Sequence, residues 1–427
     1  MKLEQGNKYS FNLENEQKEG VFINETEKHI YIKLKSGYNI GIEKAKIKET
    51  KLIEKKKQET KKEEEKPKTN KYMPTISILH TGGTVASKVD YETGAVIAKF
   101  SEKEILELFP ELKKLANIKS KLIGNMQSEM MRFAHYNILA KAVKEEAENG
   151  ADGVIITHGT DTMHYTSAAL SFALENLGIP VILVGSQRSS DRPSTDAATN
   201  LIGAAKFIIN TDFSGVAICM HEDINDKNCI ILPGTKTKKF HTSRRDAFKP
   251  INAKPIAKIN FKTGKTEFQS RYTKKEPIKR IELKLFNEKL KIGLLEVHPQ
   301  MYSQELDAYK KFDGLVIELL GIGHMPTMKV DEFTKENEEI LKSLRELCKI
   351  MPVVASTQTI YGRIDMNVYS PGKQLLEAGV LGNYTDIHPE TAFIKLAWML
   401  SNFSKNEIKM FYHKNFRGEI SERIENE

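Results

Sequence analysis

The clearest pattern along the chain is an alternation of short apolar runs with longer amphipathic segments. Apolar runs of strand length cover residues 76–79, 154–157 and 180–184. Among them, residues 133–149 and 197–209 place apolar side chains three and four positions apart, as helices with one buried face do. Strands that alternate with helices across short connections predict a parallel sheet that is covered on both faces.

A second, smaller α/β unit is expected in the C-terminal third of the chain. A lysine-rich passage, residues 251–286, leads into it and is expected to contain a hairpin around Thr263-Gly264. After this passage the alternation of apolar runs and amphipathic segments resumes. It predicts strands and helices at residues 292–297, 314–318, 336–348, 352–356 and 389–400.

The N-terminal residues follow a different rule, because apolar and polar side chains alternate there with a period of two. This alternation covers residues 21–23, 29–34 and 38–42, with turn residues between them. Fewer than fifty residues bury little core, so a compact barrel of four or five strands is the economical arrangement. Such barrels more often dock partners or RNA than catalyse.

A densely charged segment follows this β unit. From Thr50 to Lys71 the chain has nine lysines and five glutamates, with almost no apolar residue after Ile53. A segment of this composition cannot form a core, so it is expected to be a solvated helix or a flexible linker. The predicted division is a small β-barrel docking domain at 1–49, a linker at 50–72, a large α/β domain at 73–285 and a smaller C-terminal α/β domain at 286–427.

Composition limits the class of protein. A hydrophobic fraction of 40% supports packed cores, while no apolar run reaches the ~20 residues of a membrane span. The N-terminus lacks the pattern of a secretory signal, and the three cysteines form no CxxC pair, so a reducing cytoplasm is expected. The net charge of +8 is compatible with contact to RNA and equally with a solvated lysine-rich surface.

Two apolar runs end in the same kind of polar turn. The first leads into Thr81-Gly82-Gly83-Thr84, and the second leads into His158-Gly159-Thr160-Asp161. Ligands of open α/β sheets bind outside the carboxyl ends of the strands. One such turn is unremarkable, since glycine, threonine and aspartate are common in loops, but two with the same polar set indicate one shared site.

The chemistry of this site is narrowed by the motifs that are missing. No dinucleotide fingerprint, phosphate loop, paired-histidine zinc motif or serine nucleophile elbow occurs, and His80 and His158 are expected to be hydrogen-bonded strand-end residues. A threonine hydroxyl becomes a nucleophile only when a neighbouring group takes its proton. Backbone N–H groups after Thr160 could stabilise an oxyanion, so the residues favour acyl transfer from an amide.

These two turns strongly resemble the two signatures of the bacterial-type L-asparaginase/glutaminase family, and the resemblance extends over residues 74–400. It implies a two-domain α/β amidase in which Thr84 is the primary nucleophile. It also implies that Tyr91, in a polar, glycine-containing loop of the kind that closes as a lid, activates this threonine.

The same resemblance implies a second catalytic group made of threonine, aspartate and lysine. Thr160 and Asp161 match its first two members. Lys239 matches the lysine, because it precedes Phe248 by the spacing expected in the family, and Lys236 is the competing choice.

Substrate contacts are implied at Ser128 and Glu129, which occupy the position of the substrate-binding serine of the family. Met130-Met131 departs from the aspartate usual in asparaginases at this place.

Three further features resemble the amidase subunits (GatD) of archaeal glutamyl-tRNA(Gln) amidotransferases. They are the extra β unit with its linker, the segment Lys239 to Phe248, and the segment Asp386 to Trp398. This resemblance implies glutamine as substrate, no cofactor or metal in this chain, and a GatE-like partner that uses ATP and Mg²⁺ to form Gln-tRNA(Gln). A homodimer core within a heterotetramer is implied as well.

Two alternatives stay open on the sequence alone. One is a free-standing cytoplasmic L-asparaginase with an N-terminal extension. The other is a non-catalytic RNA-binding module that carries a degenerate amidase fold.

Overall fold

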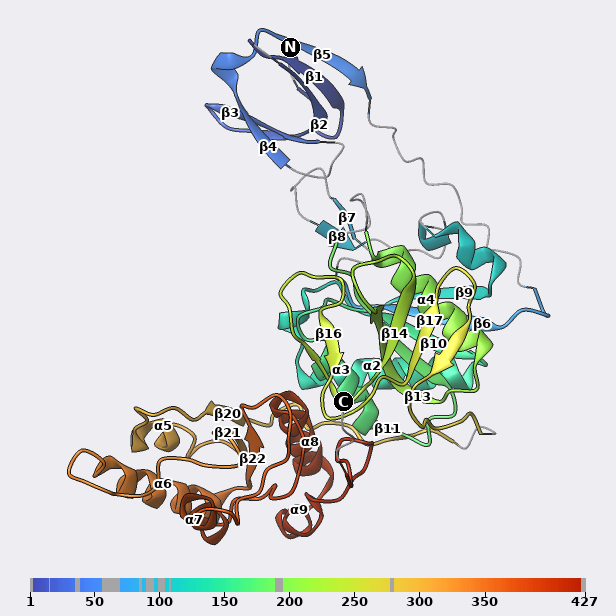
Figure 1. Cartoon of the computed structure of the whole chain (residues 1–427). Helices are drawn as coiled ribbons and strands as arrows, with labels where there is room; N and C mark the ends of the chain where they lie inside the picture. The colour runs from blue at the N-terminus through green and yellow to red at the C-terminus, as the bar shows by residue number, and fades with distance from the viewer. Residues whose placement is uncertain are drawn as a thin grey trace.

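A computed structural model describes residues 3–14, 16–34, 39–55, 70–83, 87–89, 96–98, 104–106, 109–188, 195–276 and 280–423. Figure 1 follows the chain from an N-terminal β unit in blue, through a large α/β unit in green and yellow, to a smaller α/β unit in orange and red. Among the helices that these residues form, none has the length and apolar character needed to cross a membrane.

The N-terminal unit is a five-stranded antiparallel sheet. Tyr9, Phe11, Phe22 and Ile32 lie in its core, as the period-two pattern predicts. The strand order is β4-β3-β2-β1-β5, and no pairing between described residues closes β4 onto β5, so a closed barrel stays a prediction. The strands are β1 (Lys8–Asn12), β2 (Gln17–Glu25), β3 (His29–Lys33), β4 (Asn39–Glu43) and β5 (Glu49–Glu54).

The position of β5 corrects the expected start of the charged linker. The sequence predicts a linker from Thr50 onward, but Glu49–Glu54 pairs with β1 instead. Leu52 explains the difference, because it packs against the core of this sheet while Lys51 and Glu54 are exposed to solvent. Because this segment is so highly charged, its composition indicated a linker although its exposed and partly buried residues alternate as in a strand. Residues 56–69 of the expected linker lie outside the described residues.

The large unit contains an eight-stranded sheet with the order β18-β17-β14-β13-β12-β10-β6-β9. The neighbours from β9 to β13 pair in parallel, while β14, β17 and β18 are antiparallel. The strands are β6 (Thr75–His80), β9 (Asn117–Leu122), β10 (Gly153–Thr157), β12 (Pro180–Val184), β13 (Gly215–His221), β14 (Asn228–Pro233), β17 (Ala257–Asn260) and β18 (Thr266–Phe268).

The sheet is therefore mixed, whereas the sequence pattern predicts a parallel one. Its antiparallel edge arises because β13 returns as β14 through a short turn that leaves no room for a crossover helix. The hairpin expected around Thr263-Gly264 is present and joins β17 to β18. In this turn the Asn260 side chain accepts hydrogen bonds from the backbone N–H groups of Lys262 and Thr263.

Helices cover both faces of this sheet, as the sequence predicts. Helices α2 (Phe133–Glu148) and α3 (Met163–Ala173) pack on the face that carries Leu79 and Ile156. Helix α4 (Ala197–Asn210) packs on the opposite face, against Ile78 and Ile155. The remaining strands form two-stranded ladders: β7 (Ser87–Val89) with β8 (Val96–Ala98), β11 (Leu174–Glu175) with β19 (Glu282–Leu283), and β15 (Thr237–Lys239) with β16 (Phe248–Pro250).

The C-terminal unit is built on a three-stranded parallel sheet, β20-β21-β22. Its strands are β20 (Ile292–Glu296), β21 (Gly314–Leu319) and β22 (Val353–Thr357). Its helices are α5 (Ser303–Asp307), α6 (Glu336–Ile350), α7 (Ser370–Ala378), α8 (Pro389–Asn402) and α9 (Lys405–Phe411).

Helix α8 connects the two α/β units. It contacts the three strands of the C-terminal sheet and also helix α3 of the large unit. Trp398 on this helix stacks on Phe172 of α3, with 5.2 Å between the ring centroids. The same apolar cluster contains Val316 and Val354 of the C-terminal sheet. The two units therefore share one core at this helix.

Candidate active site

The two polar turns lie side by side, because β6 and β10 are parallel neighbours. His80 pairs with Thr157 in the strand register, and His80 Nδ1 lies 2.8 Å from Thr157 Oγ1. The Thr81 hydroxyl donates to the Thr157 carbonyl at 3.0 Å. Both strands thus deliver their turns to one edge of the sheet, as the sequence predicts.

Glycines allow the two turns to touch backbone to backbone. Gly82 and Gly83 have φ of +110° and +81°, in the region that side chains rarely adopt. A Cβ atom on Gly83 would lie only 2.6 Å from the backbone nitrogen of Gly159 in the second turn. The first turn can therefore approach the second only with glycine here. Thr84 and Tyr91, the expected nucleophile and its activator, lie outside the described residues.

The structure brings together Thr160, Asp161 and Lys239. Lys239 Nζ donates to Thr160 Oγ1 at 2.8 Å and to Asp161 Oδ1 at 2.7 Å. The Lys239 side chain is 10% exposed, whereas the Asp161 side chain is 67% exposed. A cation is thus held beside the threonine hydroxyl, with one carboxylate that still faces water.

Lys239 reaches this position from a short hairpin. It lies on β15 opposite Phe248 of β16, so the spacing of these two residues in the sequence reflects a direct cross-strand pair. Lys236 is placed elsewhere: its Nζ bonds to Asp386 Oδ2 at 2.6 Å in a buried pair. Of the two lysines left open by the sequence, only Lys239 therefore contacts Thr160 and Asp161.

Ser128 and Glu129 lie next to the second turn, at the start of a short 3-10 helix, Ser128–Met130. Ser128 is buried, and its carbonyl accepts a hydrogen bond from the Thr162 hydroxyl at 2.6 Å. A Cβ atom on Gly159 would lie 2.9 Å from Ser128 Oγ. Glu129 is exposed to solvent. The serine expected to contact substrate is thus adjacent to the turn that carries Thr160.

Three buried histidines, on or next to the strands and helix that carry the two turns, are neutral. Burial lowers the pKa of His80, His158 and His164 to about 4 in each case. His158 Nε2 lies 2.9 Å from Thr166 Oγ1, which fixes the ring under the start of α3. His80 and His158 are hydrogen-bonded strand-end residues, as expected.

A carboxyl group with a perturbed pKa lies on the C-terminal unit. Burial, together with the charge of Glu390, raises the pKa of Glu318 to about 7, while Lys238 opposes the shift. Lys238 is the neighbour of Lys239 on β15, and its Nζ bonds to Glu390 Oε1 at 2.7 Å. Sequence patterns did not reveal this contact. The only signal was a run of lysines at positions 236, 238 and 239 followed by an acidic motif far along the chain.

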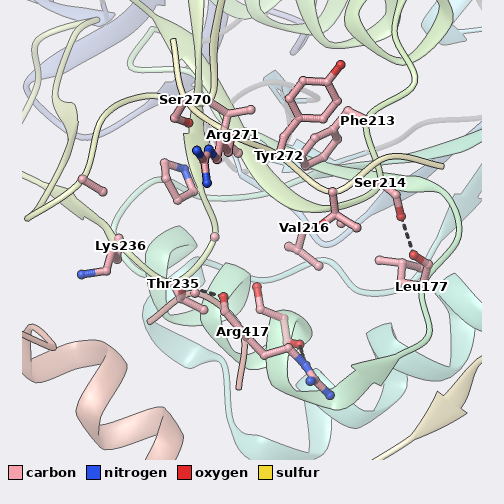
Figure 2. A pocket seen from close by; sticks show the side chains of 18 of the residues that line it. Leu177, Phe213, Ser214, Val216, Thr235, Lys236, Ser270, Arg271, Tyr272 and Arg417 are labelled. Carbon is pink, nitrogen blue, oxygen red and sulfur yellow. Dashed lines mark hydrogen bonds between the residues drawn. The ribbon is translucent and has the colours of Figure 1, made fainter. Parts of the chain in front are cut away.

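A cavity lies away from this site. Its volume is about 1390 Å³, and Figure 2 shows Lys236, Thr235 and Arg417 among the residues around it. None of the residues that line it is Thr160, Asp161 or Lys239. The cavity opens beside the segment that precedes β15, and the threonine, aspartate and lysine lie at the far end of that strand.

The described residues include no cluster of three or more histidine, cysteine, aspartate or glutamate side chains that could hold a metal ion. The three cysteines are free thiols: Cys219 and Cys229 are buried, and Cys348 is partly buried.

Comparison with known proteins defines the class to which this fold and site belong. Residues 75–274 match the family described as asparaginase, N-terminal, and residues 291–410 match the glutaminase/asparaginase C-terminal domain. The thermostable L-asparaginase from Thermococcus kodakarensis is similar in structure, with a TM-score of 0.70 and 32% identity over 82% of this chain and 100% of that one. The L-asparaginase I from Vibrio cholerae gives a TM-score of 0.69 and 27% identity over 82% of this chain and 99% of its own. These matches define an asparaginase-type α/β amidohydrolase.

The N-terminal unit makes the assignment more specific, since residues 3–53 match the GatD N-terminal domain. The GatD subunit of the glutamyl-tRNA(Gln) amidotransferase from Methanococcus maripaludis is 42% identical over 400 residues, which cover 92% of each chain. The corresponding subunit from Pyrococcus furiosus is 42% identical over 399 residues, which cover 92% of this chain and 87% of that one. The chain belongs to the GatD family of glutamyl-tRNA(Gln) amidotransferase subunits.

Proposed function

We propose that this chain hydrolyses the side-chain amide of glutamine and supplies the ammonia to a partner subunit that amidates Glu-tRNA(Gln). The observation that carries the proposal is the contact of Lys239 Nζ with both Thr160 Oγ1 and Asp161 Oδ1, beside the paired glycine turns. The shared family and the name of its members support glutamine as the amide and a tRNA-linked acceptor.

In the proposed reaction, the hydroxyl oxygen of Thr84 attacks the amide carbon of glutamine, and the carbonyl oxygen becomes an oxyanion. The hydroxyl proton moves to the leaving nitrogen, the C–N bond breaks, and ammonia departs. Glutamate is left as an ester on the threonine. Water then adds to the ester carbon, the C–O bond to Thr84 breaks, and glutamate and the free hydroxyl are regenerated.

The group formed by Thr160, Asp161 and Lys239 assists proton transfer and stabilises the charge that develops during the reaction. The Thr160 hydroxyl relays the proton: it gives up its own proton toward the leaving nitrogen as it accepts the proton of Thr84. Lys239 as a cation stabilises the negative charge that develops on the Thr160 oxygen during this relay, and Asp161 holds the ammonium in place. Backbone N–H groups at the start of α3 stabilise the oxyanion. Tyr91 activates Thr84 from the lid loop, and Ser128 with Glu129 contacts the amino-acid part of the substrate.

The partner carries the other half of the chemistry. We assign ATP and Mg²⁺ to a GatE-like subunit, with no cofactor in this chain, and place the complex in the cytoplasm. Two copies of this chain form the core of a heterotetramer that binds tRNA(Gln). The N-terminal sheet is a docking unit, and the chain's net charge of +8 suits an RNA-bearing assembly.

Ammonia release by the full-length chain tests the proposal. The rate is measured with glutamine and with asparagine, first alone, then with the partner, then with partner and Glu-tRNA(Gln). We expect a preference for glutamine, a rate that rises in the full complex, and its loss in Thr84→Val, which removes only the hydroxyl. Loss of one member of a cooperating catalytic set costs on the order of 10³-fold or more.

Fast asparagine turnover that neither partner nor tRNA alters would instead identify a free-standing asparaginase. Thr84→Val with more than about a tenth of the wild-type rate would remove Thr84 from the role of nucleophile, given the size of loss expected.

A further inference from the structure

The strand that carries Lys239 has little support from backbone pairing. Strand β15 has three residues and, within the described part of the chain, pairs with β16 alone, outside the eight-stranded sheet. The contact of Lys239 with Asp161 cannot hold the strand either, because Asp161 is largely exposed. Exposed ion pairs contribute about 1 kcal/mol or less. The position of Lys239 must therefore be set by other contacts of this strand.

Such contacts come from the segment Asp386–Thr391, which leads into α8. Glu390, in the first turn of this helix, bonds through Oε1 to Lys238 Nζ at 2.7 Å, and its Oε2 accepts from His388 Nδ1 at 2.9 Å. Its side chain is 11% exposed. Burial alone would raise the pKa of Glu390, but the hydrogen bond from His388 and the charges of His388 and Lys238 hold it well below its usual range. Glu390 is thus a carboxylate at neutral pH.

The same segment also holds the backbone just before β15. The Thr391 hydroxyl donates to the carbonyl of Thr235 at 2.9 Å, and His388 Nε2 lies 3.0 Å from the same hydroxyl. One hydrogen-bonded chain therefore reaches β15 through the side chain of Lys238, and it reaches the backbone two residues before β15 through the carbonyl of Thr235. All of its members except Lys238 are buried.

We propose that the segment Asp386–Thr391 is a positioning element for Lys239. Glu390, acting through Lys238, and Thr391, acting through Thr235, hold β15 so that Lys239 Nζ stays within hydrogen-bond distance of Thr160 and Asp161. The C-terminal unit thereby takes part in the amide hydrolysis of the large unit. Because a misplacement of 1 Å in a catalytic group can cost on the order of 10²-fold in rate, this support matters for kcat. The inference rests on the proposed function.

The first test compares kcat and KM for glutamine in the full-length chain. Glu390→Gln keeps the shape of the side chain and removes its charge, and Thr391→Val removes the hydroxyl. We expect each to lower kcat by about 10-fold or more with little change in KM, since the displaced group acts on the reaction and not on substrate binding. Lys238→Arg keeps the charge opposite Glu390 and is expected to retain most of kcat.

A matched control lies on the same helix. Lys395 of α8 forms a fully buried pair with Glu419 at 2.7 Å and donates to the carbonyl of Lys414, so both partners lie in the C-terminal tail and not on β15. Lys395→Met is expected to destabilise the chain while the folded protein keeps the wild-type kcat. If Glu390→Gln and Lys395→Met both lose kcat in proportion to their loss of stability, Glu390 is only a structural residue and the inference is wrong.

A second measurement does not depend on turnover. Lysine acetylation by an N-hydroxysuccinimide ester, followed by mass spectrometry, reports how well each amine is protected. Lys239 should be acetylated several-fold faster in Glu390→Gln than in the wild type, and at the wild-type rate in Lys395→Met. If Lys239 is acetylated at the same rate in Glu390→Gln as in the wild type, the inference is wrong. This result does not depend on glutamine hydrolysis. A wild type that hydrolyses no glutamine would refute only the proposed function.

Discussion

Lys236 and Lys239 are three residues apart, yet their environments predict losses of stability of very different size when each lysine is replaced. Lys236 Nζ lies 2.6 Å from Asp386, and the two side chains are 5% and 0% exposed. Burial lowers the pKa of Lys236 even though Asp386 opposes the shift, which shows how costly the desolvated charge is. Lys236→Met leaves the carboxylate of Asp386 buried without its cation. Breaking a buried pair in this way costs about 3–5 kcal/mol.

For Lys239→Met the expected loss is about 1 kcal/mol or less, because the partner Asp161 is 67% exposed and can be solvated. The assay is urea unfolding followed by the fluorescence of Trp398, the single tryptophan, which is buried on α8 close to Asp386 in the chain. We expect the free energy of unfolding of the two variants to differ by at least about 2 kcal/mol. Asp386→Asn added to Lys236→Met should recover part of the loss. Equal losses, or a larger loss for Lys239→Met, would refute the reasoning.

Three further predictions concern the site and its surroundings. Asp161→Ala and Lys239→Met should lower kcat by similar factors, and the double variant should lose little more than either alone, because the two residues act as one unit in the proposed mechanism. Additive losses in glutamine hydrolysis would show that they act independently. Gly83→Ala should lose activity, because its Cβ would meet the backbone of Gly159 at 2.6 Å, while Gly150→Ala, with φ of +80° but no described atom within 4 Å, should keep it. The free energy of unfolding should fall as pH drops from 6.5 to 4, because the unfolded chain binds protons at its histidines while His80, His158 and His164 stay neutral when folded. Each contributes up to about 3 kcal/mol over that range, so His164→Phe should flatten the pH dependence of the urea midpoint.

Local pattern was sufficient to predict most of the fold. The runs at β10 and β12 are buried on both faces, and such strands have continuous apolar sequences. The amphipathic segments became α2 and α4, since an apolar stripe must face a sheet. The parallel neighbours β6 and β10 followed from two strands with the same terminal turn. These features depend on a few consecutive residues, and a single sequence contains that information.

The errors have a common cause, because each concerns which strands pair with one another. Strand β5 pairs with β1, some forty residues earlier in the chain, and only Leu52 shows that its charged sequence has a buried face. The antiparallel edge of the large sheet depends on which strand β14 joins after its turn. The periodicity of the sequence encodes neither the pairing of β5 nor that of β14, because each pairing depends on which strand of the sheet has a free edge.

The lysine segment shows how far this limit extends into function. Three lysines within four residues look alike in sequence, and composition alone describes them as one basic run. In the structure each has a different carboxylate: Lys236 has Asp386, Lys238 has Glu390, and Lys239 has Asp161. Two of these carboxylates lie on the C-terminal unit and one on the large unit. The strand therefore lies where the two units meet, and only its last lysine points to the threonine. In the proposed function one lysine of this run takes part in the chemistry, while the other two bond to carboxylates of the C-terminal unit. The burial of the partner carboxylates distinguishes them.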